Sequence, residues 1–139
     1  TILWIVLILA AWIAMIFYFG QGKWGRSQTQ QLIDRLRAHP RIHAFLDRHH
    51  GKFRAAFHYL EFGGLTLLVY TGLTWWADGS LREWSDTRGA VSGGIGALAA
   101  LLDELHQKMS STRQFRRVDY LHSLCGIAIA LLLLRYLGL

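Results

Sequence analysis

The sequence predicts an all-α, polytopic membrane protein, a bundle of four transmembrane helices with a basic amphipathic connection between helices 1 and 2. Two observations carry this prediction. Hydrophobic residues make up 53% of the 139 residues, charged residues make up 17%, and the apolar residues gather in four blocks. Most of the fifteen Lys and Arg residues lie between the blocks and give the chain a net charge of +6. A chain of this length is expected to form one domain, residues 1–139.

The four apolar blocks are expected to cross the membrane at about residues 2–20, 55–77, 89–107 and 119–137. A membrane-spanning helix needs about twenty predominantly apolar residues. The first block has no charged residue, and aromatic residues follow it instead of a small-residue cleavage site, so we interpret it as a retained helix. The third block reaches the required length only if its polar end lies at the membrane interface or within the protein.

The basic residues predict the orientation of the chain. Eight of them lie in the connection 20–54 and four in the connection 106–118, which leaves three for the rest of the chain. Four spans place these two connections on the same side, and the positive-inside rule makes that side cytoplasmic, with both termini outside. A basic membrane-facing surface attracts anionic lipids. Membrane lipids are therefore the expected partners, and we predict no nucleic-acid binding.

The first connection has helical periodicity of its own. Ser27 can cap a short helix that ends before His39-Pro40, and a second short amphipathic piece over residues 42–46 leads towards the second span. Pieces of this kind usually lie in the plane of the membrane interface.

Small residues indicate which face of each span packs against its neighbours. In the third span Gly93 and Ala97 share a helical face with Glu104, and in the fourth span Gly126 shares one with Asp119. Small residues let helices approach closely in lipid. The carboxylates are therefore expected to face the bundle. A carboxylate deep in a bilayer costs at least about 2.5–3.5 kcal/mol, so we expect the helix ends to pair their polar groups.

The candidate site is the polar cluster that these helix ends would form. Its predicted members are His58, Glu61, Asp103, Glu104, His106, Gln107, Arg113, Asp119 and His122. Arg113 or Arg116 would supply the counter-charge. The cluster can be read as structural salt bridges, as a binding site for a lipid headgroup or polar ligand, or as a metal site. The carboxylate–His pairs spaced i,i+3 resemble bundle metal sites, but no full ligand set is identifiable, so we predict no metal. The sequence requires no cofactor.

Three segments carry a resemblance to a known family. "HYLEFGGL" opens the second span, "LLDELHQ" closes the third, and Arg113 stands six residues before Asp119. In order and spacing, over nearly the whole chain, these segments resemble the VanZ-like family of small membrane proteins. The resemblance places the family's motif positions at His58, Glu61, Asp103, Glu104, His106, Gln107, Arg113, Asp119 and Gly126. Ser111-Thr112 replaces the family's usual Pro-Gly, Phe115 replaces a Gly, and Ser123 replaces an acidic or amide residue.

The resemblance implies a binding or accessory role in the cell envelope, in a bacterial cytoplasmic membrane. The family's named member is associated with low-level resistance to the glycopeptide antibiotic teicoplanin. One alternative is a small accessory subunit of a larger membrane complex, such as a photosynthetic or electron-transfer complex. Another is a metal-dependent membrane enzyme. Catalytic residues are not identifiable from the sequence, so a non-enzymatic role is favoured.

Overall fold

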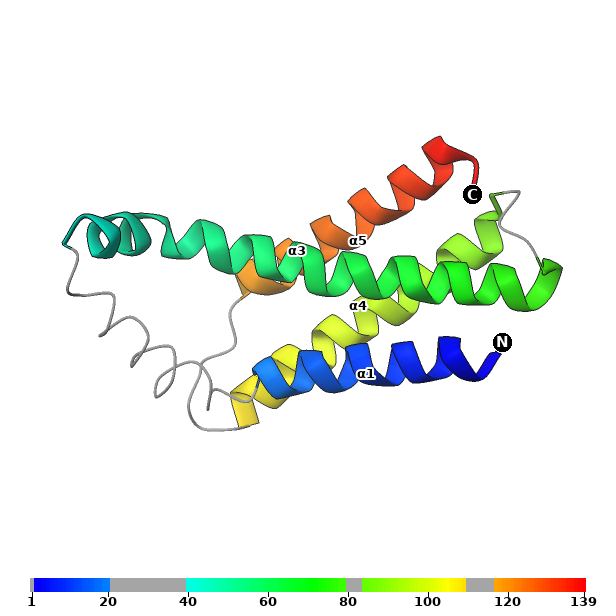
Figure 1. The fold of residues 1–139 in the computed structure, drawn as a ribbon, viewed down its shortest axis with the longest axis horizontal. Coiled ribbons are helices and arrows are strands. Elements are labelled where there is room, and N and C mark those ends of the chain that lie inside the picture. Colours follow the sequence, from blue (N-terminus) through cyan, green and yellow to red (C-terminus); the bar gives the residue numbers. More distant parts are fainter. Residues whose placement is uncertain (1, 21–39, 80–83, 110–116) are drawn as a thin grey trace.

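A computed structural model of the chain describes residues 2–20, 40–79, 84–109 and 117–139. These residues form four helices, α1 (Ile2–Gly20), α3 (Pro40–Asp78), α4 (Asp86–Met109) and α5 (Arg117–Leu137), and the described ranges contain no strand (Figure 1). The predicted all-α, four-helix class is therefore confirmed.

Helix α3 is the centre of the arrangement because it contacts each of the other three helices. Helices α4 and α5 also pack on each other, whereas α1 packs mainly on α3. The core at these contacts is formed by Ile16, Phe62, Leu65, Val69, Ala100 and Ile127. Both chain termini lie at one end of the bundle, and the other end holds the end of α1, the end of α4 and the start of α5 (Figure 1).

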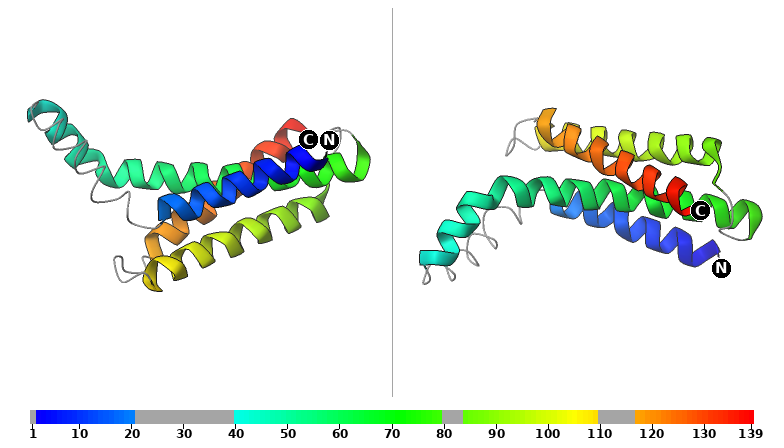
Figure 2. Two further views of the ribbon diagram at one scale, coloured as in Figure 1. Left: turned by 60° about the horizontal axis from the view of Figure 1, so that its bottom comes forward. Right: turned by 90° about the horizontal axis from the view of Figure 1, so that it is seen from above.

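Helix α3 corrects the predicted division of the first connection. The piece over residues 42–46 is not a separate helix, because α3 runs without interruption from Pro40 to Asp78. Its 39 residues span roughly 58 Å. The helix is uninterrupted because the sequence has no proline after Pro40. A glycine in a helix interior, such as Gly51, costs about 1 kcal/mol of stability, which a long helix tolerates. The first turns of α3 extend past the other helices and bend away from them (Figure 2). The predicted helix that begins at Ser27 lies outside the described residues.

The helices lie close to the four expected spans, but they differ in apolar character. Within the described ranges, α5 is the one helix that is both long and apolar enough to cross a membrane, and a shorter apolar stretch runs from Leu3 to Ile16 in α1. Glycines, His58 and Glu61 interrupt the apolar residues of α3, and glycines and acidic residues interrupt those of α4. The four spans and their orientation therefore stay predictions.

The burial of α4 and α5 confirms that the carboxylates face the bundle, although Gly93 and Ala97, the small residues predicted to pack in α4, are only half-buried. The buried residues of α4 are Gly89, Ser92, Gly96, Ala100, Asp103, Glu104 and Gln107. On the opposite side of this helix, Leu98, Leu102 and Leu105 are exposed. The buried residues of α5 are Asp119, Ser123, Gly126, Ile127, Ala130 and Leu134. On both helices the carboxylates extend the row of buried small residues, as the sequence indicated.

Glycines bring the backbones of α3 and α5 into contact. A Cβ atom on Gly126 would lie 2.6 Å from the carbonyl oxygen of Tyr59 and 2.7 Å from its Cα. A Cβ on Gly63 would lie 2.9 Å from the carbonyl oxygen of Gly126. Backbone atoms cannot move aside as a flexible side chain can. The close approach of the two helices therefore depends on the missing side chains at these positions.

We predict that Gly126→Ala destabilises the fold, whereas Gly94→Ala does not. The new methyl group at position 126 would force α3 and α5 apart, at a cost of about 1–3 kcal/mol. Gly94 lies in α4 with open space where its Cβ would be, and alanine in a helix interior is favoured over glycine by roughly 0.5–1 kcal/mol. Denaturant or thermal unfolding in detergent measures both changes. Equal stability of the two variants would contradict the close contact at Gly126.

Candidate functional site

Three helices bring one ionisable side chain each to a single buried point. His58 from α3, Glu104 from α4 and Asp119 from α5 each place a potential ligand atom, a ring nitrogen or a carboxylate oxygen, within 4.8 Å of the other two. Their exposed fractions are 6%, 1% and 2%. We refer to His58, Glu104 and Asp119 as the buried triad. All three were members of the predicted polar cluster.

The positions of the triad follow from the packing faces of the helices. His58 stands four residues before the buried Phe62, and Glu104 stands four residues after the buried Ala100. Asp119 stands seven residues before Gly126. Residues at these spacings share one face of a helix. The faces that bury apolar and small residues along the bundle thus continue into the triad at its end.

Arg54 provides a positive charge to the triad. Its Nη2 atom donates a hydrogen bond to Asp119 Oδ2 over 2.5 Å, and the two side chains are 24% and 3% exposed. Sequence reasoning missed this partner and assigned the counter-charge to Arg113 or Arg116, which lie outside the described residues. A signal was present, because Arg54 precedes His58 by four residues and so lies on the same face of α3.

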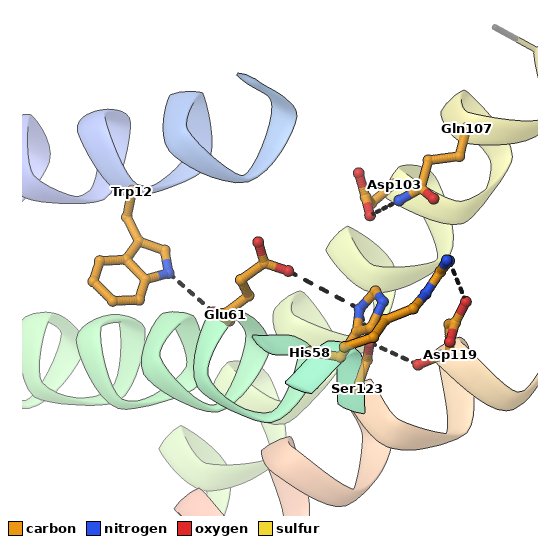
Figure 3. Close-up of polar contacts among 8 residues, drawn as sticks. Trp12, His58, Glu61, Asp103, Gln107, Asp119 and Ser123 are labelled. Atoms are coloured by element: carbon orange, nitrogen blue, oxygen red, sulfur yellow. Dashed lines mark hydrogen bonds and ion pairs between the residues drawn. The ribbon is translucent and has the colours of Figure 1, made fainter. Parts of the chain in front are cut away.

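Ser123 and Glu61 orient the imidazole of His58. The Ser123 hydroxyl donates to the backbone oxygen of Asp119 over 3.1 Å and lies 3.4 Å from His58 Nδ1. Glu61 Oε2 lies 4.0 Å from the same nitrogen (Figure 3). The hydrogen of the Ser123 hydroxyl already points to the backbone oxygen of Asp119, so its oxygen can only accept from His58. This arrangement favours the tautomer of His58 with its proton on Nδ1. Ser123 stands where the resemblance predicts an acidic or amide side chain, and it is part of the site.

Asp103 and Gln107, two further predicted residues, lie on the helix that carries Glu104. On α4, Gln107 Nε2 donates to Asp103 Oδ2 over 2.6 Å, and both residues are buried (Figure 3). The indole of Trp12 in α1 donates to the backbone oxygen of Glu61 over 2.9 Å. This last bond attaches the most peripheral helix to the polar end of the bundle.

The other two histidines of the predicted cluster do not join the triad. His106 and His122 are both half-buried. The ring of His122 meets that of Tyr59 edge to face at 5.5 Å between centroids. The sequence suggested that ligands could pair as i,i+3 neighbours on one helix. The group that the structure brings together in the described ranges instead takes one residue from each of three helices.

Comparison with known protein families gives a match. The sequence model of the VanZ/LLP1 family matches residues 4–138, which is nearly the whole chain. This match confirms the resemblance found in the motifs. Neither a curated protein nor a solved structure matches the chain.

We predict that Arg54 and Asp119 are energetically coupled. Asp119 is almost fully buried, so a double-mutant cycle with Arg54→Gln and Asp119→Asn should show an interaction energy of about 1–3 kcal/mol in unfolding measurements. The matched control is the ion pair between Arg88 and Asp78, whose Asp78 side chain is 44% exposed. A cycle on this exposed pair should give about 0–1 kcal/mol. Additive effects at Arg54 and Asp119 would mean that their contact contributes nothing.

Proposed function

Because the chain belongs to the VanZ/LLP1 family, we propose that it is an integral membrane protein whose buried triad and neighbouring residues bind a polar ligand at one face of the bilayer. In this proposal α1, α3, α4 and α5 each cross the membrane. The outer faces of the helices support it, since they carry large exposed apolar side chains. Examples from the four helices are Trp4, Leu7, Phe57, Leu60, Leu98, Leu102, Leu121 and Leu132. Surfaces of this kind suit acyl chains, whereas soluble monomers rarely expose large apolar patches.

The observation that carries the binding role is the burial of ionisable groups from three separate helices at one point. Salt bridges that only fix helix register can form at the exposed ends of helices, where charges remain hydrated and desolvation costs little. Glu104 and Asp119 are instead at most 2% exposed. Ionisable residues inside a membrane bundle are costly and typically mark a ligand, ion or proton site.

The ligand class that we favour is a lipid-linked or glycopeptide-type compound of the cell envelope with a polar or anionic head. The family association with glycopeptide resistance suggests this class. Arg54 supports an anionic group, because its guanidinium lies beside the triad and its buried Nε has no hydrogen-bond acceptor within the described part of the chain. Arginine binds phosphate and carboxylate groups through several donors in one plane.

A second candidate is the role of accessory subunit in a larger membrane complex. The groove between α4 and α5 favours it, because Gly89, Ala90, Gly93 and Gly94 line one wall and Leu131 and Leu132 line the other. Small residues on a membrane helix allow a partner helix to approach closely. In this case the buried triad would stabilise the subunit, and the partner would be a helix of another protein.

Native mass spectrometry of the protein purified in mild detergent separates these functions. We expect a co-purifying lipid or envelope compound on the wild-type chain, with strongly reduced occupancy in Glu104→Gln. Asp78→Asn is the matched control, because Asp78 is an exposed acidic residue at the other end of α3. A stoichiometric protein partner that survives Glu104→Gln would favour the accessory role. A ligand retained equally by all three proteins would contradict binding at the triad.

A further inference from the structure

We propose that the buried triad of His58, Glu104 and Asp119 binds one divalent transition-metal cation, with Zn²⁺ and Mn²⁺ as the best-suited ions. This inference concerns the site of the proposed function and rests on it for its biological meaning. Metal binding itself can be measured without knowledge of the organic ligand. The proposal departs from the sequence-based expectation of no metal, which considered only i,i+3 pairs within single helices.

The geometry of the triad is close to that of a coordination site. One potential ligand atom from each side chain lies within 4.8 Å of the other two. Nitrogen and oxygen ligands bind Zn²⁺ at about 2.0–2.2 Å, so two ligands of a tetrahedral ion lie roughly 3.4 Å apart. Small side-chain rotations therefore suffice to bring the three atoms onto one ion. The helices α3, α4 and α5 pack directly on one another, which fixes the backbone that carries the ligands.

Among the residues that the structure describes, the charges around the triad favour a cation. Glu104 and Asp119 contribute two buried carboxylates, while Glu61 and Asp103 carry further carboxylates on the adjoining turns of α3 and α4. Arg54 opposes a cation, but its single positive charge is bound to Asp119 Oδ2. The two carboxylates of the triad would attract a divalent cation while the pair of Arg54 and Asp119 persists.

The surroundings of His58 match those of a metal-binding histidine. Such histidines usually donate their other ring N–H to an oxygen, which fixes the tautomer and the orientation of the ring. Ser123 Oγ lies 3.4 Å from His58 Nδ1 and Glu61 Oε2 lies 4.0 Å from it. With Nδ1 beside these two oxygens, a metal would be bound through Nε2.

The chemistry of the donors decides which ions fit. Imidazole suits Zn²⁺ and carboxylates also suit Mn²⁺, whereas Mg²⁺ and Ca²⁺ prefer sites made entirely of oxygen atoms. Three protein ligands leave a coordination position open on Zn²⁺, as in sites that bind a further molecule. An oxygen atom of the proposed polar ligand could occupy that position. The cation would then connect the triad to the ligand.

To test the proposal, the full chain is purified in detergent, bound metal is removed with a chelator, and the binding of added Zn²⁺ or Mn²⁺ is measured. Titration calorimetry and elemental analysis should show one Zn²⁺ per chain. We expect His58→Gln and Glu104→Gln each to weaken the affinity by at least about 100-fold, because loss of a supporting residue alone weakens metal sites about 10–100-fold. His122→Gln is the matched control, since His122 lies one turn from Asp119 but outside the triad. It should leave the affinity unchanged.

Circular dichroism and gel filtration check that each variant is folded. As a second readout, Zn²⁺ should raise the unfolding temperature of the wild type and of His122→Gln. The wild type binding neither Zn²⁺ nor Mn²⁺ would overturn the proposal. Binding that survives both His58→Gln and Glu104→Gln would also overturn it, because another histidine would then hold the metal. A co-purifying lipid that depends on Glu104 in a metal-free protein would refute the cation while it supports the proposed function.

Discussion

Charged groups can be buried between helices only when neighbouring groups compensate them, and this constraint governs the end of the bundle where α3, α4 and α5 meet. Asp119 is 2% exposed and accepts a hydrogen bond from Arg54, which reaches it from a different helix. The Arg54 side chain is 24% exposed, and we expect the two residues to be coupled by about 1–3 kcal/mol. The pair therefore fixes how the start of α5 sits against α3. That placement in turn puts Asp119 beside His58 and Glu104.

The compensation works only because the helix backbones approach closely. Gly126 touches the backbone of Tyr59, and Tyr59 directly follows His58 in α3. A larger residue at position 126 would move α5 away from α3 beside the turn of α3 that carries His58. Packing and polar chemistry are thus coupled at this end of the bundle, and the glycines are as necessary to the site as its ionisable residues.

The sequence predicted the parts of this arrangement that depend on one helix at a time. The small residues of α4 and α5 indicated that Glu104 and Asp119 face the bundle, since a helical face can be read from spacing alone. The sequence could not show that the triad takes one residue from each helix, because that depends on how the three helices are aligned. Arg54 was missed for a related reason. Its partner is 65 positions away, and the basic residues nearer to Asp119 in sequence were the simpler choice.

The convergence of His58, Glu104 and Asp119 in a lipid bilayer is the central claim. Solid-state NMR of the chain in bilayers, with ¹⁵N-labelled histidine and glutamine and ¹³C-labelled aspartate and glutamate, measures it directly. We predict correlations between the ring nitrogens of His58 and the carboxylate carbons of Glu104 and Asp119. Each correlation is assigned to its carboxylate by its loss in Glu104→Gln or Asp119→Asn. Their absence in a sample that shows the amide of Gln107 in contact with the carboxylate of Asp103 would contradict the account.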